Sequence, residues 1–88
     1  GRGYATDAAC EALRVGFEEI GLDEIVSFTV VQNERSWRVM ERIGLVRDPS
    51  RDFDHPRVDP IAYPDLVRHI LYRLSRSAWK MHQGKTDA

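Results

Sequence analysis

The chain has 88 residues, of which 42% are hydrophobic and 31% charged, the balance of one small globular domain rather than a disordered segment. Its formal net charge of -1 comes from 13 basic and 14 acidic residues, so it lacks the strong positive field that holds nucleic acids. The single cysteine cannot form an intrachain disulfide, and there is no apolar run of membrane-spanning length and no signal-peptide pattern. We therefore expect a cytoplasmic protein.

A helix is predicted from Tyr4 to Ile20, where small and apolar residues recur at alternating steps of three and four. Gly21 follows at a position where helix ends favour positive φ. Cys10 lies beside the apolar stripe, so we expect a small core residue rather than a nucleophile. The stripe comprises Ala5, Ala8, Ala9, Ala12, Leu13, Gly16, Phe17 and Ile20.

The segment from Glu24 to Val30 is rich in β-branched and aromatic residues and predicts a strand. Its apolar residues do not strictly alternate with polar ones, so we expect both faces of this strand to be covered. Asn33 is a suitable N-cap for a second helix, and Gly44 is a suitable residue to end it. A helix, a strand and a helix therefore follow one another in the first half of the chain.

The second half of the chain predicts shorter elements. Residues 45–48 indicate a short strand, and residues 66–74 indicate a last strand. Between them, residues 49–65 contain four prolines, which exclude a continuous helix or central strand, so we expect an ordered loop. A short helix is predicted at 75–83, followed by a polar tail at 84–88. The order helix, strand, helix, strand, loop, strand indicates an α/β (α+β) fold in which two helices pack on a small sheet.

Two motifs in the first half carry residues that could bind a ligand. Gly1-Arg2-Gly3-Tyr4-Ala5 opens the first helix, where unpaired backbone N–H groups and the small glycines can together hold an anion. The same residues also fit an ordinary turn. Asn33-Glu34-Arg35-Ser36 opens the second helix, and it equally fits a capping asparagine with a serine in the first turn.

A third motif, Asp52-Phe53-Asp54-His55-Pro56, lies in the proline-rich loop. Its carboxylates and imidazole could deprotonate an incoming ammonium group or line an acceptor pocket, with Asp54 and His55 as the substrate-side candidates. They could instead stabilise the loop through hydrogen bonds. Their spacing matches no familiar ligand set, so we predict no metal site. Four further side chains are expected to be structural: Trp37, His69, Tyr72 and Trp79.

Taken together, the first two motifs resemble the GNAT superfamily of N-acetyltransferases. The resemblance runs over nearly all of the chain up to Leu74 and is strongest toward ribosomal-protein N-acetyltransferases of the RimJ/RimL type. It implies that residues 1–75 are the C-terminal half of a GNAT domain, the half that binds acetyl-coenzyme A, followed by a helix and tail at 76–88. It rests on Gly1-Arg2-Gly3-Tyr4-Ala5-Thr6-Asp7-Ala8-Ala9, on the strand from Ile25 to Val30, and on Asn33 and Ser36 followed by Val39-Met40-Glu41-Arg42-Ile43-Gly44-Leu45.

The resemblance also implies roles for individual residues. Gly3 and Ala5 match the last two fixed positions of the family's phosphate-binding motif, whose leading glutamine or arginine would precede residue 1. The N–H groups of this turn would hold the diphosphate of coenzyme A. Asn33 would hydrogen-bond the pantetheine arm or the adjoining backbone, and the Ser36 hydroxyl would donate to the departing thiolate as general acid. The implied cofactor-binding set is Gly1, Arg2, Gly3, Tyr4, Ala5, Asn33 and Ser36.

By this resemblance the protein is an enzyme that moves an acetyl group from acetyl-CoA to an amine by direct attack, without a covalent enzyme intermediate. The acceptor would be a protein N-terminus or a small molecule, and no nucleic acid, membrane or metal is expected. The strand that gives the family's oxyanion contact, and much of the acceptor pocket, would precede Gly1. The alternative is a truncated, non-catalytic GNAT-like module that binds coenzyme A or completes its sheet as a homodimer through an exposed edge.

Overall fold

Strand β4, Arg68–Ser75, is the centre of the sheet in this computed structural model, which describes residues 2–87. Strand β1, Glu24–Val30, pairs with it antiparallel along its whole length, from Glu24 opposite Ser75 to Val30 opposite His69. Strands β2, Val46–Arg47, and β3, Phe53–Asp54, also pair antiparallel with β4. The sheet order is β1-β4-β2, so one edge of β1 has no partner strand within residues 2–87.

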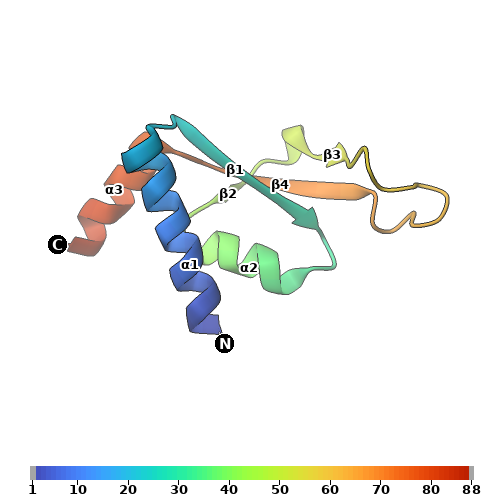
Figure 1. Cartoon of the computed structure of the whole chain (residues 1–88), viewed down its shortest axis with the longest axis horizontal. Helices are drawn as coiled ribbons and strands as arrows, with labels where there is room; N and C mark the ends of the chain where they lie inside the picture. The colour runs from blue at the N-terminus through green and yellow to red at the C-terminus, as the bar shows by residue number, and fades with distance from the viewer. Residues whose placement is uncertain (1, 88) are drawn as a thin grey trace.

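Three helices accompany this sheet (Figure 1). Helix α1, Arg2–Arg14, continues as a π-helical segment, Val15–Ile20. Helix α2, Glu34–Arg42, connects β1 to β2, and α3, Arg76–Asp87, follows β4 directly. Figure 1 shows α2 meeting α1 near its middle, while β3 and the loop after it project from the opposite end of the sheet. No helix within residues 2–87 is long and apolar enough to cross a membrane.

The core forms where the helices pack on alternate residues of β4. Phe17 and Trp79 stack with ring centroids 5.2 Å apart, so α3 is packed against the π-helical segment that follows α1. Burying an aliphatic or aromatic side chain of this size contributes about 1.5–3 kcal/mol, so this cluster holds the helices on the sheet. Its buried members are Leu13, Phe17, Met40, Ile43, Leu45, Ile70, Tyr72, Leu74 and Trp79.

Two glycines let the helices reach these positions. A Cβ atom on Gly16 would lie 2.6 Å from the Cδ1 atom of Ile25, so a larger residue would force the end of this side chain to move. Gly44 has a φ of 103° and ends α2 in a Schellman motif, in which the Leu45 N–H donates to the Met40 carbonyl at 2.9 Å. The buried Leu45 supplies the hydrophobic contact of this motif.

Most predicted elements are confirmed in type and approximate position. The first helix starts at Arg2 rather than Tyr4, and β1 has the predicted bounds. The last strand is β4, shifted to 68–75, and Trp79 and Tyr72 are core residues as expected. The predicted tail is wrong over residues 84–87, which continue α3, and Ala88 lies outside the described residues.

Three other expectations are wrong. The face of β1 opposite the core is open, since Val26 and Phe28 are 40% and 46% exposed. Residues 49–65 are not a loop throughout, because they contain a 3₁₀ turn, Pro49–Arg51, and strand β3, which is held by its pairing with β4. Cys10 is exposed rather than part of the core.

Candidate functional site

A cavity of about 410 Å³ lies between α1, β1 and α2. Most of its described lining is apolar, and three of the described polar side chains border it: Ser27, Arg35 and Ser36. This combination of an apolar wall with a few polar groups is typical of ligand sites of this size. The described lining residues are Ala5, Ala9, Ala12, Leu13, Ile25, Val26, Ser27, Arg35, Ser36, Val39, Met40, Ile43 and Leu45.

The first turn of α1 stands at one side of this cavity. The predicted glycine-rich turn is helical from Arg2 onward, so its backbone N–H groups belong to the helix start and have no carbonyl partner within the helix. Ala5 lines the cavity, and a Cβ atom on Gly3 would meet nothing within 4 Å, which leaves open space beside this turn. Tyr4 is exposed and does not line the cavity, and Gly1 lies outside the described residues.

The first turn of α2 borders the cavity from another side. The Asn33 Oδ1 atom accepts a hydrogen bond from the Ser36 backbone N–H at 3.3 Å, so the capping role considered for Asn33 is confirmed. Asn33 is exposed and is not part of the cavity lining. The Ser36 side chain lines the cavity, and its hydroxyl has no hydrogen-bond partner among residues 2–87.

The structure thus brings two of the predicted residues, Ala5 and Ser36, to one cavity. A hydrogen bond of 3.4 Å from the Arg42 guanidinium to the Thr6 hydroxyl links the two helices next to it. The helix macrodipole places partial positive charge at the start of each helix, so both starts favour an anionic ligand. Chemically, the arrangement can hold a phosphate near backbone N–H groups and an apolar chain along the alanine-lined wall of α1.

Sequence reasoning missed Ser27 and Arg35 as lining residues. Residues 25–27 line the cavity consecutively, although alternate residues of a strand point to opposite faces, because the cavity follows the unpaired edge of β1. This edge offers backbone N–H and C=O groups that have no strand partner in the part of the chain that the structure describes. A serine between the apolar Val26 and Phe28 was the available signal.

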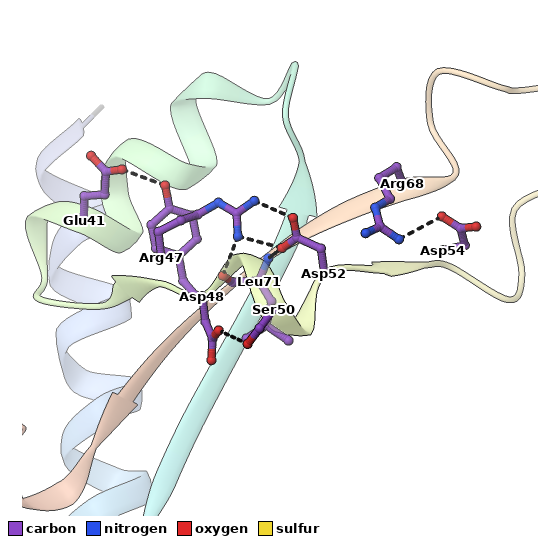
Figure 2. Close-up of polar contacts among 9 residues, drawn as sticks. Glu41, Arg47, Asp48, Ser50, Asp52, Asp54, Arg68 and Leu71 are labelled. Atoms are coloured by element: carbon purple, nitrogen blue, oxygen red, sulfur yellow. Dashed lines mark hydrogen bonds and ion pairs between the residues drawn. The ribbon is translucent and has the colours of Figure 1, made fainter.

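The predicted Asp52–His55 motif lies elsewhere. Figure 2 shows the Asp52 carboxylate between the Arg47 guanidinium, at 2.5 and 2.6 Å, and the Leu71 backbone N–H, at 3.0 Å. These Arg47 hydrogen bonds hold the pKa of Asp52 below its usual range, aided by the Leu71 N–H and opposed by partial burial. Asp52 therefore stabilises the loop, one of the alternatives left open by the sequence.

Tyr72 connects this ion pair to α2. Its hydroxyl donates to the Glu41 carboxylate at 2.6 Å, and the Arg47 guanidinium lies 5.9 Å from the centre of its ring. Burial, followed by the hydrogen bond to Glu41, raises the pKa of Tyr72 to about 12. The phenol therefore keeps its proton at neutral pH, and the side chain acts as a structural contact, as predicted.

The two substrate-side candidates, Asp54 and His55, do not border the cavity. Asp54 forms an exposed ion pair with Arg68 at 3.4 Å (Figure 2), a contact of little energetic weight. His55 accepts a hydrogen bond from the Arg57 N–H through Nδ1 at 3.2 Å, and its ring centre lies 5.0 Å from that of His69. Both rings pack near Phe28 and Phe53. Within residues 2–87, no three His, Cys, Asp or Glu side chains are grouped so that they could hold a metal ion.

A comparison with known protein families matches the first half of the chain. A family model described as "Acetyltransferase (GNAT) domain" matches residues 1–46 of the 88. Every residue that lines the cavity lies between positions 5 and 45, inside the matched segment. The match therefore covers the cavity but not the Asp52–His55 motif.

Individual relatives extend the similarity. The uncharacterized N-acetyltransferase YnaD of Bacillus subtilis (strain 168) is 40% identical over 47 residues, which are 53% of this chain and 28% of that protein. The FsC-acetyl coenzyme A-N(2)-transacetylase of Aspergillus fumigatus is 44% identical over 82 residues, which are 90% of this chain and 32% of that protein. The chain thus spans about a third of the length of these relatives.

A solved structure shows a similar fold. The acetyltransferase (GNAT family) from Bacillus anthracis matches with a TM-score of 0.70 and 28% identity, covering 88% of this chain and 43% of that one. The similarity in three dimensions therefore reaches beyond the segment matched by the family model.

The Asp52 ion pair leads to a prediction about stability and pH. Replacing Asp52 by Asn should lower the free energy of unfolding by about 2 kcal/mol at pH 7, because it removes the charged acceptor of Arg47 and Leu71. Since the folded-state pKa of Asp52 is depressed, its contribution is present above the unfolded pKa of about 4 and is lost as the pH falls through the folded value. The difference between wild type and D52N should therefore shrink on acidification, as measured by urea unfolding from pH 7 to pH 3.

The matched control is Asp54→Asn, which changes the exposed carboxylate of the same motif. It should alter the unfolding free energy by less than about 0.5 kcal/mol. Equal effects of the two substitutions at pH 7 would contradict a structural role specific to Asp52.

Proposed function

Because this chain belongs to the acetyltransferase (GNAT) domain family, whose model matches residues 1–46, we propose that it is the coenzyme-binding part of an N-acetyltransferase that uses acetyl-CoA. The observation that carries the proposal is the single cavity bordered by both Ala5 and Ser36. Both residues belong to helix starts, yet they come from different helices separated by strand β1. A shared cavity is what a single extended ligand would require.

The chemistry of the cavity fits the parts of acetyl-CoA. The diphosphate would lie at the N–H groups of Arg2 to Ala5, where the start of α1 favours negative charge by roughly 0.3–1 kcal/mol. The pantetheine arm would run along the wall formed by Ala5, Ala9 and Ala12, and its amides could bond to the unpaired edge of β1. Asn33 caps α2 through its oxygen, and its amide nitrogen would donate to the arm.

Ser36 is the proposed catalytic residue. In the transfer, the amine nitrogen of the acceptor attacks the thioester carbonyl carbon, the C–S bond breaks, and coenzyme A leaves as a thiolate. The amine gives up a proton and the thiolate takes one up, so no covalent enzyme intermediate forms. The unpartnered hydroxyl of Ser36 would donate to the departing sulfur as general acid. Tyr72 does not take this role, since it donates to Glu41 and its pKa is raised to about 12.

The acceptor is proposed only by class, as the amine of a protein N-terminus, as in the RimJ/RimL type, or of a small molecule. One relative is named an acetyl coenzyme A-N(2)-transacetylase, which supports an amine acceptor for this group of proteins. Asp54 and His55 would contact the acceptor only if it extended to the β3 end of the sheet, away from the cavity.

The unpaired edge of β1 and the exposed Val26 and Phe28 favour a second candidate function. In that case the chain is a non-catalytic module that binds coenzyme A or forms a homodimer through this edge. Sedimentation separates the cases, because a monomer at all concentrations rules out the homodimer. Coenzyme binding without acetyl transfer would favour the non-catalytic module.

A charge introduced at Ala5 tests the diphosphate site. Ala5→Glu should weaken acetyl-CoA binding about tenfold or more, because its carboxylate would lie beside the proposed diphosphate site at the first turn of α1 and repel the diphosphate. The helix itself should persist, since glutamate is favourable in a first turn. The matched control is Ala8→Glu, which adds the same charge at an exposed position outside the lining. Isothermal titration calorimetry measures both variants, and equal affinities would count against the site.

A second substitution tests the role of Ser36. Ser36→Ala should leave acetyl-CoA affinity within about threefold but lower the rate of acetyl transfer about 100-fold, because the leaving thiolate loses its donor. Thiol release with a panel of amine acceptors measures the rate. Ser77→Ala, at an exposed position on α3, is the control for loss of a hydroxyl. Turnover that is unchanged in S36A would remove Ser36 from the mechanism.

A further inference from the structure

We propose that Arg35 binds a phosphate group of the coenzyme and thereby sets how strongly the site prefers phosphorylated ligands. The inference rests on the proposed function, since it concerns the same cavity. Among the described side chains that line the cavity, Arg35 is the one charged residue, and the others are small, apolar or hydroxylic. No described carboxylate borders the cavity, so no negative charge among the described lining residues would repel an anion bound there.

The position of Arg35 on α2 directs it toward this space. Arg35 and Val39 are four residues apart and therefore share one face of the helix, and both line the cavity next to Ser36. Arg35 belongs to the first turn of α2, so its positive charge adds to that of the helix start. The guanidinium and the two helix starts produce a positive potential around an otherwise apolar cavity.

The other two arginines of α2 are already engaged. Arg38 forms an ion pair with Glu34 and lies over the Trp37 ring, 5.8 Å from its centre. Arg42 donates to Thr6 at 3.4 Å. The Arg35 guanidinium has neither an ion pair nor a hydrogen bond with any described residue, so its five donors remain available. Because a guanidinium can donate two parallel hydrogen bonds to one phosphate, Arg35 is suited to this ligand.

Two phosphates of coenzyme A could be the partner: the diphosphate and the 3′-phosphate of the ribose. Both carry the chemistry that a guanidinium recognises, and they differ in their distance from the thioester. Comparing coenzyme A with 3′-dephospho-coenzyme A distinguishes them, because the second ligand lacks only the 3′-phosphate.

The experiment compares wild type, Arg35→Gln, Arg35→Lys and the control Arg38→Gln by titration calorimetry, at low and at high salt. R35Q should bind coenzyme A about tenfold more weakly at low salt, R35K should recover part of the loss, and R38Q should match wild type. The loss should shrink at high salt, because screening weakens a charge contact. A loss that disappears with dephospho-coenzyme A identifies the 3′-phosphate, and a loss that persists identifies the diphosphate.

Two results would overturn the proposal while leaving the proposed function intact. One is wild-type affinity in R35Q when wild type binds coenzyme A normally. The other is a loss in R35Q that is equal at low and high salt and is not recovered in R35K, which would mean a packing contact instead of a charge. A wild-type chain that binds no coenzyme A would overturn both this proposal and the proposed function.

Discussion

The pairing of β1 with β4 is the constraint on which the rest of the structure depends. The register runs through seven residue pairs, from Glu24 opposite Ser75 to Val30 opposite His69. It directs Ile25 and Ser27 toward the helices together with Leu74 and Tyr72, and it leaves the other edge of β1 unpaired. A shift of one residue would exchange the two faces of β1 and direct Val26 and Phe28 toward the helices in place of Ile25 and Ser27.

Two packing contacts hold the helices that border the cavity in place. At Gly16 the helix packs on the Ile25 side chain of β1, where an added Cβ atom would lie 2.6 Å from Ile25 Cδ1. Leu13 of α1 and Ile43 at the end of α2 belong to the same core cluster. From there the helices run to their first turns, whose side chains are small or polar: Ala5 on α1 and Ser36 on α2. The fold thus keeps an apolar cavity open between two helix starts, where an anionic ligand is favoured.

Charge is distributed unevenly, although the net charge of the chain is only -1. Within the described part of the chain, the cavity is bordered by one guanidinium and no carboxylate. The carboxylates of Asp48 and Asp52 lie on the far side of β4, where Arg73 and Arg47 pair with them. The Tyr72–Glu41 hydrogen bond connects these two regions by tying α2 to the central strand. Net charge alone therefore gave no indication of an anion site.

Local patterns were sufficient to predict α1, β1 and α2. Their apolar spacing, the Asn33 cap and the Gly44 stop depend on neighbours within one helix or strand, and each is present as predicted. The failures depended on distant partners. Strand β3 is two residues long and forms because Phe53 pairs with His69. The structural role of Asp52 depends on its hydrogen bonds from Arg47 and the Leu71 N–H. The spacing of apolar residues along the sequence does not predict such long-range contacts.

For the candidate site, sequence motifs identified some of the residues at the cavity and missed others. Ala5 and Ser36 were identified by motif, and they border one cavity. Ser27 and Arg35 were missed, because their place at the cavity depends on how β1 and α2 pack against α1. Asp54 and His55 were selected for their chemistry alone, and they lie near β3 outside the cavity.

The most direct test of the central claim is to map backbone amide shifts by two-dimensional NMR as acetyl-CoA is added to the chain. The account predicts that the largest changes fall at residues 2–5, along 25–27 and at 33–36, with residues 52–55 and 68–69 nearly unchanged. Changes centred on the β3 end, or no change at saturating acetyl-CoA, would contradict it.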